Sequence, residues 1–116
     1  MAFQRACALD DIKDDAALGV TVDGQDVALA RHGDEVFAVE DICSHAAVPL
    51  SEGEVDECTV ECWLHGSRFD LRTGKPTGLP ATEPVATFPV EVRANADGSA
   101  DIYVDITTTL NGVTPQ

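Results

Sequence analysis

The sequence predicts an all-β domain, an antiparallel sandwich or barrel, and two observations support this. Short runs of alternating apolar and polar residues recur along the 116-residue chain, separated by turn residues such as Asp23-Gly24. No segment has the apolar spacing of a long amphipathic helix. With 44% hydrophobic residues the chain can bury one modest core. We therefore expect one domain over residues 1–106, followed by a loose tail over 107–116, where no pattern is present.

The first third of the chain is expected to form strands joined by short turns. A charged stretch at 8–15 predicts a turn or a single helical turn. Strands are expected on both sides of it, at residues 3–7, 19–22, 27–31 and 36–39. The last two alternate around His-Gly-Asp-Glu and predict a hairpin, with His32 as a solvated residue of its turn.

The rest of the chain continues the pattern, with strands expected at residues 55, 58–62, 69–72, 85–92 and 100–106. Within 58–62, alternate residues share one face, so Cys58 is expected to face the core while Cys62 ends the strand. A tight turn is expected at 73–76. Pro89 should lie at a sheet edge, because proline cannot donate to a ladder of hydrogen bonds.

Two cysteine–histidine pairs are the most specific feature of the sequence. Cys43-Ser-His45 is followed after sixteen residues by Cys62-Trp-Leu-His65. Thiolate and imidazole are the side chains that best bind soft or borderline metals. Each pair is short enough for one loop to direct both of its side chains at a common point, so the four residues predict a metal centre.

Two metal centres fit two sulfur and two nitrogen ligands. One is a single tetrahedral zinc ion. The other is a [2Fe–2S] cluster with two thiolates on one iron and two imidazoles on the other. Zinc sites usually group cysteine with cysteine and histidine with histidine along the chain. The interleaved order favours the cluster, with Cys43 and Cys62 on one iron and His45 and His65 on the other.

At these residues the sequence resembles the Rieske family. CSH-x16-CWLHGSRFD followed by LRTGKP is similar to the soluble Rieske-type ferredoxins, which include the electron-carrier subunits of aromatic-ring dioxygenase systems. The resemblance runs from about residue 27 to 104. It implies one [2Fe–2S] cluster on a Rieske-type sandwich or barrel, with a small cluster-binding subdomain of two ligand loops at about 41–84. Val48 and Leu64 stand where quinol-oxidising Rieske proteins carry a disulfide, so the chain resembles the ferredoxins instead.

Five further residues are expected around the cluster: Trp63, Gly66, Ser67, Phe69 and Pro80. Gly66 permits a backbone turn that a side chain would block. Phe69 stands where the high-potential pattern has a tyrosine that donates to the ligand sulfur, which implies a potential in the lower part of the roughly −150 to +300 mV Rieske range. Trp63 either shields the cluster or packs the core, and we favour packing. By resemblance the loop containing Pro80, residues 78–84, is a rigid lid; an ordinary connection is the alternative.

The net charge of −14, from 21 acidic and 7 basic residues, argues against partners with anionic surfaces, such as nucleic acid or membranes. Charged residues near the two loops suggest a mixed docking rim for a redox partner: Glu52, Glu54, Asp56, Glu57, Glu61, Arg68, Arg72 and Lys75. No apolar run is long enough to span a membrane, and the start lacks a signal peptide's apolar core, so we expect a cytoplasmic monomer. Cys7 and Cys58 are interpreted as free buried thiols.

The predicted function is one-electron transfer from a flavoprotein ferredoxin reductase to a terminal oxygenase or other redox acceptor. Beyond the cluster ligands only His32 remains, so the chain cannot build a two-histidine oxygenase iron site, and substrate chemistry belongs to a partner. Two alternatives stay open. One is a redox subunit of a nitrite reductase or of iron–sulfur cluster assembly, and the other is a zinc-stabilised interaction module.

Overall fold

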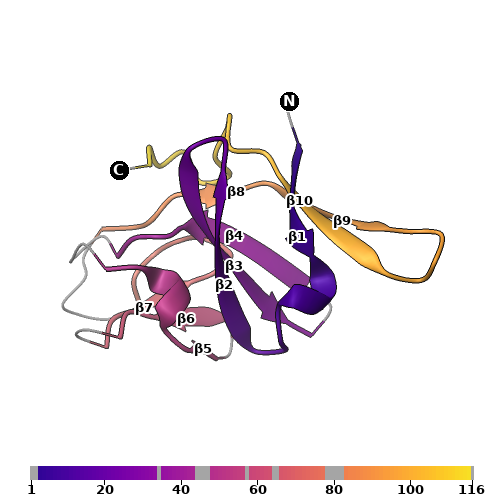
Figure 1. The fold of residues 1–116 in the computed structure, drawn as a ribbon. Helices are drawn as coiled ribbons and strands as arrows, with labels where there is room; N and C mark the ends of the chain where they lie inside the picture. Colours follow the sequence, from indigo (N-terminus) through magenta and orange to yellow (C-terminus); the bar gives the residue numbers. More distant parts are fainter. Residues whose placement is uncertain are drawn as a thin grey trace.

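Three antiparallel sheets make up the protein, in a computed structural model that describes residues 3–33, 35–43, 48–56, 58–63, 66–77 and 83–115. Within these ranges no α-helix is present, so the predicted all-β class is confirmed (Figure 1). The strands are β1 (Gln4–Ala8), β2 (Ala16–Val22), β3 (Gln25–His32), β4 (Glu35–Glu40), β5 (Val55–Asp56), β6 (Thr59–Glu61), β7 (Arg68–Asp70), β8 (Thr87–Phe88), β9 (Val90–Ala94) and β10 (Ala100–Val104). Two 3-10 turns, η1 (Leu9–Asp11) and η2 (Leu50–Glu52), complete the elements.

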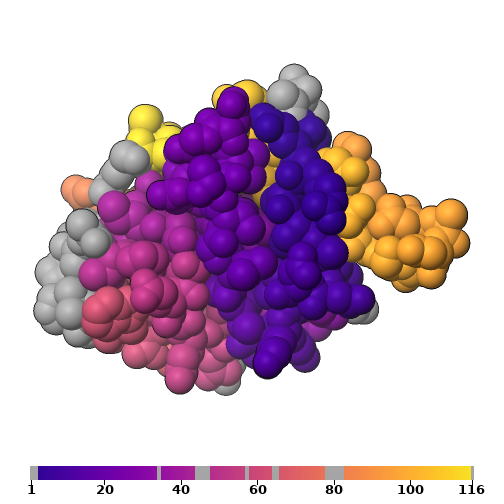
Figure 2. All heavy atoms as spheres, in the orientation of Figure 1, coloured from indigo at the N-terminus to yellow at the C-terminus, as the bar shows by residue number. Residues whose placement is uncertain are grey.

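The sheets have the strand orders β2-β3-β4-β8, β1-β10-β9 and β5-β6-β7. The short sheet β5-β6-β7 lies at one end of the molecule and the β9–β10 hairpin at the other (Figure 1). The hairpin stands out from the body in the space-filling view (Figure 2). The short sheet falls within the stretch 41–84 for which a subdomain was predicted.

Pro89 marks the point where the chain changes sheet. We expected one strand over 85–92, but the structure has two: β8 pairs with β4, and β9 pairs with β10. Proline has no N–H to donate, so a continuous ladder cannot pass through it. The break lets Phe88 enter one sheet while Val90 pairs with Val104 in another.

The β2–β3 and β3–β4 hairpins fix the central sheet. The Asp23-Gly24 turn is confirmed, with Val22 paired to Gln25. The predicted β3–β4 hairpin is also confirmed, but His32 is the last residue of β3, paired with Glu35, and not a turn residue. β2 begins at Ala16, three residues before the strand that we expected at 19–22.

Strand β3 is buried on both faces and divides the apolar core in two. Val27 and Leu29 face one cluster, which also contains Cys7, Ile12, Ala38, Ala86, Phe88, Ile102 and Val104. Ala28 and Ala30 face the other, which contains Val39, Cys43, Leu50, Val55, Val60, Cys62, Phe69, Leu71 and Val85. This division follows from the period of two along a strand. We call the second group the cysteine core.

Cys58 does not face the core as its place in the pattern 58–62 predicted. Its backbone has a left-handed φ of 61°, and its side chain is only half-buried. This conformation interrupts the strand alternation, so β6 begins after it and only Val60 and Cys62 enter the cysteine core.

The C-terminal segment makes specific contacts, whereas we expected it to be loose. The backbone N–H of Leu110 donates to the carbonyl of Thr87 at 2.8 Å. The side chain of Asn111 donates to the carbonyls of Thr73 and Val85. Val113 packs against the first core cluster. Residues 110–113 are therefore attached to the domain.

Candidate metal centre

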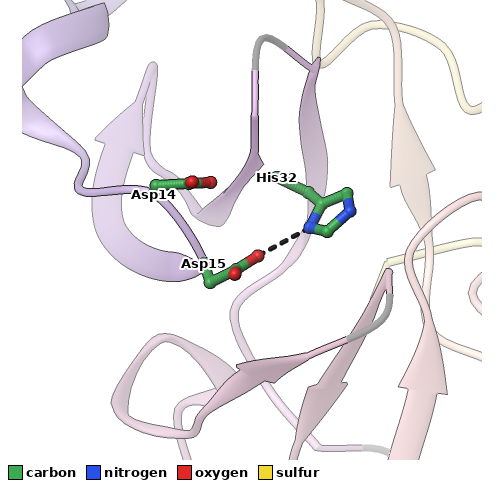
Figure 3. A group of neighbouring side chains, drawn as sticks. All are labelled: Asp14, Asp15 and His32. Atoms are coloured by element: carbon green, nitrogen blue, oxygen red, sulfur yellow. Dashed lines mark hydrogen bonds and ion pairs between the residues drawn. The ribbon is translucent and has the colours of Figure 1, made fainter.

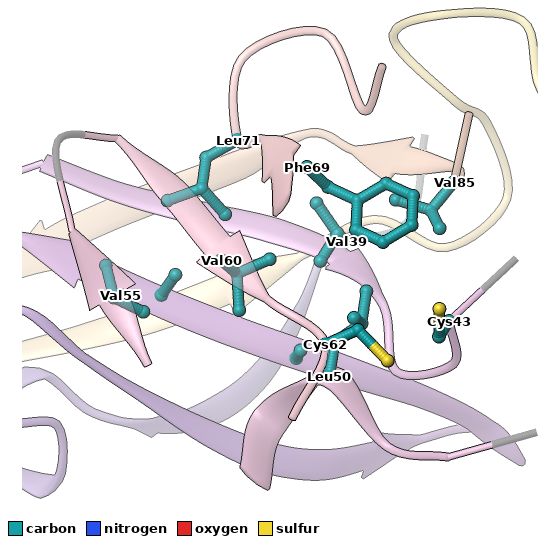
Figure 4. Close-up of a cluster of buried hydrophobic side chains, with 11 residues drawn as sticks. Val39, Cys43, Leu50, Val55, Val60, Cys62, Phe69, Leu71 and Val85 are labelled. Carbon is teal, nitrogen blue, oxygen red and sulfur yellow. The ribbon is translucent and has the colours of Figure 1, made fainter. Parts of the chain in front are cut away.

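The two cysteines of the predicted metal centre follow different strands and lie in the same core. Cys43 comes three residues after the end of β4, and Cys62 directly follows β6. Both belong to the cysteine core and are 1% and 0% exposed. Figure 4 shows the sulfur of Cys62 directed toward the segment that carries Cys43. The structure thus brings together the two thiols that the motif predicted, while His45 and His65 lie outside the described residues.

The first ligand loop is fixed at its base by two sets of hydrogen bonds. The backbone N–H of Cys43 donates to the carbonyl of Val48 at 2.9 Å. Just before Cys43, the carboxylate of Asp41 accepts bonds of 2.7 Å from both the backbone N–H and the hydroxyl of Ser51. Hydrogen bonds to a charged acceptor are stronger than neutral ones. Asp41 therefore holds the start of this loop against η2.

The second ligand loop is closed by Cys62 itself. Its backbone N–H donates to the carbonyl of Ser67 at 2.6 Å, and its carbonyl accepts from the N–H of Gly66 at 2.8 Å. Gly66 has a φ of 77°, the conformation for which a glycine was expected here. Outside this ring, Glu61 and Arg68 pair across β6 and β7 and form an ion pair at 2.8 Å. The loop is thus closed at its base by main-chain bonds and a side-chain pair.

Backbone packing also supports the strand that precedes Cys62. Gly53 lies so close to β6 that a Cβ atom added to it would be 1.6 Å from the carbonyl oxygen of Glu61. The N–H of Glu61 donates to the carbonyl of Glu54 at 2.8 Å. The segment after η2 therefore rests directly on the residue next to Cys62. Nothing in the local sequence indicates this close approach at Gly53.

The side chains around the two cysteines are mostly apolar. Phe69 is fully buried in the cysteine core, and Ser67, two residues before it, is 1% exposed. Trp63 is 51% exposed, so the prediction that it packs the core is wrong. Because Trp63 directly follows Cys62, an exposed aromatic surface lies beside a buried ligand. Pro80 and its loop, residues 78–82, lie outside the described residues.

The predicted docking residues separate into two groups. Glu52, Glu54 and Asp56 are exposed along η2 and β5, next to the strand that leads to Cys62. Two of the three basic residues form ion pairs within the protein. Arg68 pairs with Glu61, and Arg72 lies 3.5 Å from Glu35. The guanidinium of Arg72 also lies 5.5 Å from the centre of the Phe37 ring. Lys75 is exposed, and Glu57 lies outside the described residues. The three acidic residues and Lys75 are thus exposed to solvent, and Arg72 is exposed beside Glu35.

A third group of potential ligands lies away from the cysteines. Asp14, Asp15 and His32 place their ligand atoms within 4.8 Å of one another (Figure 3). The contacts within the protein account for them: His32 Nδ1 lies 2.6 Å from Asp15 Oδ1, and Asp14 accepts the N–H of Gly33 at 2.7 Å. The hydrogen bond and the charge of Asp15 raise the pKa of His32. We did not predict this pair, because we expected the strand to begin at residue 19. In the structure β2 begins at Ala16, which pairs with Arg31, so Asp15 lies opposite His32.

Cys7 is a structural thiol. It is buried in the first core cluster, and burial, together with the nearby charge of Asp11, raises its pKa to about 11. At neutral pH it therefore stays protonated, which suits neither metal binding nor nucleophilic chemistry.

Comparison with known proteins identifies what the chain resembles. Residues 2–89 match the family model of the Rieske [2Fe-2S] domain. Among curated proteins, the ferredoxin subunit of anthranilate 1,2-dioxygenase from Burkholderia cepacia is 39% identical over 97 residues, which cover 84% of this chain and 87% of that protein.

Solved structures give the same answer for the fold. The ferredoxin of carbazole 1,9a-dioxygenase from Nocardioides aromaticivorans IC177 superposes with a TM-score of 0.75 at 35% identity, covering 88% of this chain and 97% of that one. A chain in the complex of reduced oxygenase and oxidised ferredoxin of carbazole 1,9a-dioxygenase superposes with a TM-score of 0.74 at 34% identity, covering 88% of this chain and 91% of that one. The structure contains no helix long and apolar enough to cross a membrane within the residues it describes.

Proposed function

Because the chain belongs to the Rieske [2Fe-2S] family, we propose that it is the one-electron carrier of a ring-hydroxylating dioxygenase system. It would take electrons from a flavoprotein ferredoxin reductase and deliver them to a terminal oxygenase. The observation that carries this proposal is the likeness to dioxygenase ferredoxin subunits over most of both chains. The solved complex of a dioxygenase ferredoxin with its oxygenase supports the choice of acceptor.

The cysteine core fits the sulfur half of the expected ligand set. Cys43 and Cys62 come from separate elements, are buried, and lie in one apolar cluster, which suits two thiolates on the same iron. We assign His45 and His65 to the second iron from their place in the motif. When bound, the cluster supplies reversible one-electron reduction. The chain's own residues hold the ligands and exclude water from the sulfurs.

The residues around the cysteines favour a low reduction potential. Hydrogen bonds donated to the cluster stabilise its more negative, reduced form and raise the potential. Phe69, buried in the cysteine core, has no hydroxyl to donate. We therefore propose a potential in the lower part of the Rieske range, which suits a carrier reduced by a nicotinamide-linked reductase.

We place the docking surface around the second ligand loop. Trp63 is an exposed aromatic side chain beside Cys62, and aromatic residues are enriched at the energetic centres of interfaces. The exposed Glu52, Glu54 and Asp56 lie on the adjoining η2–β5 segment. Their negative charge would attract a partner with a basic patch and raise the association rate at low salt.

Stopped-flow kinetics with a reductase and an oxygenase of such a system test the proposal. The reduced protein should pass its electron to the oxygenase, and the rates should fall as salt shortens the Debye length to about 8 Å at 0.15 M. Glu54→Gln should slow transfer at low salt, whereas Asp10→Asn, which removes one exposed charge at η1, should not. Failure to reduce the oxygenase would refute the acceptor, and rates indifferent to salt and to Glu54→Gln would refute the acidic docking surface.

We also propose that the carrier is a cytoplasmic monomer. Cys7 and Cys58 are thiols in the structure, the state that a reducing cytoplasm maintains. Light scattering on the purified protein would test the monomer, and fractionation of the source cells would test the location.

A further inference from the structure

The side chain of Asn111 joins two segments that are distant from it in the sequence. Its Nδ2 donates to the carbonyl of Thr73 at 2.9 Å and to the carbonyl of Val85 at 2.8 Å. Its Oδ1 accepts from the N–H of Thr87 at 3.3 Å and from the N–H of Val113 at 3.2 Å. A side-chain amide has two donor hydrogens and two acceptor lone pairs, so Asn111 uses its full capacity here.

The neighbours of Asn111 also fix its orientation. Two carbonyl oxygens face the nitrogen and two N–H groups face the oxygen, so rotating the amide by half a turn would oppose like groups on both sides. An aspartate at this position would have the same shape, but it would direct a second oxygen at the two carbonyls. The contact therefore depends on the amide and not on shape alone.

The segments that Asn111 joins are packed tightly against each other. The N–H of Val85 donates to the carbonyl of Gly74 at 2.9 Å. A Cβ atom added to Gly74 would lie 2.2 Å from the carbonyl oxygen of Val85 and 2.7 Å from Asn111 Nδ2. We call this contact of Thr73, Gly74, Val85 and Asn111 the C-terminal junction. It has no room for a side chain at position 74.

The C-terminal junction adjoins the core that holds the ligand cysteines. Val85 is fully buried in the cysteine core, where Figure 4 shows it beside Phe69. On the other side of the junction, the turn at Thr73 follows β7, which contributes Phe69 and is followed by Leu71, another core residue. β7 in turn pairs with β6, whose last residue precedes Cys62. Asn111 thus holds the two segments that supply one wall of the cysteine core.

We propose that Asn111 is a positioning residue for the iron–sulfur cluster, acting through the C-terminal junction. It keeps the segment of Val85 and the turn after β7 at a fixed separation, so that the apolar wall stays closed over the cysteine sulfurs. Without the amide, the carbonyls of Thr73 and Val85 would lose their donors and turn toward water. The wall would then loosen, and water would approach the thiolates.

The test uses the holoprotein and the isosteric variant Asn111→Asp. At temperatures where the variant is folded, we expect a shifted midpoint potential, an altered electron paramagnetic resonance line shape and faster amide hydrogen exchange at Val85. Loss of the visible absorbance in the presence of a chelator should be about tenfold faster, since two hydrogen bonds are removed. Asn111→Gln keeps the amide donors on a longer side chain. Its potential and its rate of absorbance loss should lie between those of the wild type and those of Asn111→Asp.

The matched control is Asn95→Asp in the β9–β10 turn. Asn95 also donates two side-chain hydrogen bonds, to Ser99 at 3.0 Å and to Asp101 at 3.2 Å, but it lies outside the cysteine core. This variant should lower thermal stability at most and leave the potential and the absorbance decay unchanged.

The proposal is overturned if Asn111→Asp melts at a lower temperature but keeps the wild-type potential, resonance signal and decay rate, because Asn111 would then only anchor the tail. If Asn111→Asp does not fold, Asn111→Gln decides by the same measurements, and wild-type values count against the proposal. The inference rests on cluster binding alone. Its failure would leave the proposed electron-carrier function intact, since no partner takes part in the test.

Discussion

Replacing Gly53 with alanine should destabilise the protein at the strand that precedes Cys62, although the backbone conformation of Gly53 permits alanine. Gly53 has φ −87° and ψ 177°, an extended conformation open to every residue, so the change carries no backbone penalty. The added Cβ would lie 1.6 Å from the carbonyl oxygen of Glu61, and real Cβ contacts are essentially never shorter than 3.0 Å. The two backbones must therefore separate by at least about 1.4 Å.

The size of the effect follows from what this separation disturbs. Overpacking in a tight site costs about 1–3 kcal/mol. The bonds from Gly53 N–H to Leu50 at 3.0 Å and from Glu61 N–H to Glu54 at 2.8 Å are also strained, and each is worth about 1 kcal/mol. We expect a loss of about 3 kcal/mol, which for a domain of this size lowers the melting temperature by roughly 10 °C.

Thermal melting of the holoprotein, followed by far-ultraviolet circular dichroism and by the visible cluster absorbance, measures this effect. The control is Gly98→Ala in the β9–β10 turn, where φ is 90° and the added Cβ would meet nothing within 4 Å. It should cost only about 1–2 kcal/mol of backbone strain and leave the visible spectrum unchanged. A Gly53→Ala protein that melts like the wild type with an unaltered spectrum would refute the close-approach reasoning.

Three further predictions concern the cluster surroundings and one remote pair. Phe69→Tyr should raise the potential measured by protein-film voltammetry by tens of millivolts, since ~0.5 kcal/mol for one added hydrogen bond corresponds to about 23 mV. Ser67→Ala should lower it if the hydroxyl donates to the cluster, and an unchanged potential in both variants would exclude hydrogen-bond tuning here. The folded protein raises the pKa of His32 above 6.5 through Asp15, so the pair stabilises the fold fully below that pH and loses its effect as pH rises through the folded pKa. Asp15→Asn, at a φ of 54° that asparagine tolerates, should therefore lower the melting temperature at pH 6 and not at pH 9, and an equal change at both would contradict the linkage.

The fold class and the metal motif could be predicted from sequence because both depend on local patterns. Alternation with a period of two reports which strand face is buried, and it located the β3–β4 hairpin. The spacing of Cys43 and Cys62 within two mixed pairs indicated a shared centre, and both thiols lie in one core. The Asp23-Gly24 turn followed from residue type alone.

The remaining features depend on contacts between distant segments. Asn111 gave no local signal, because its partners are carbonyl and N–H groups that any residue can supply. For Trp63 we favoured packing in the core over shielding of the cluster, but it directly follows Cys62 in a closed loop, where it is exposed. At Pro89 the sequence predicted an edge position within one strand, but it could not show that the residues on either side of Pro89 join different sheets.

Electron paramagnetic resonance of the dithionite-reduced protein, with iron and labile sulfide quantified in the same sample, determines whether the chain holds a [2Fe–2S] cluster on cysteine and histidine ligands. We predict a coloured protein with about two irons and two sulfides per chain and a rhombic signal, as expected for a cluster with mixed cysteine and histidine ligands. Cys43→Ser and Cys62→Ser should each abolish the signal. A colourless protein containing one zinc ion, or a Cys62→Ser variant with a full-strength signal, would contradict this prediction.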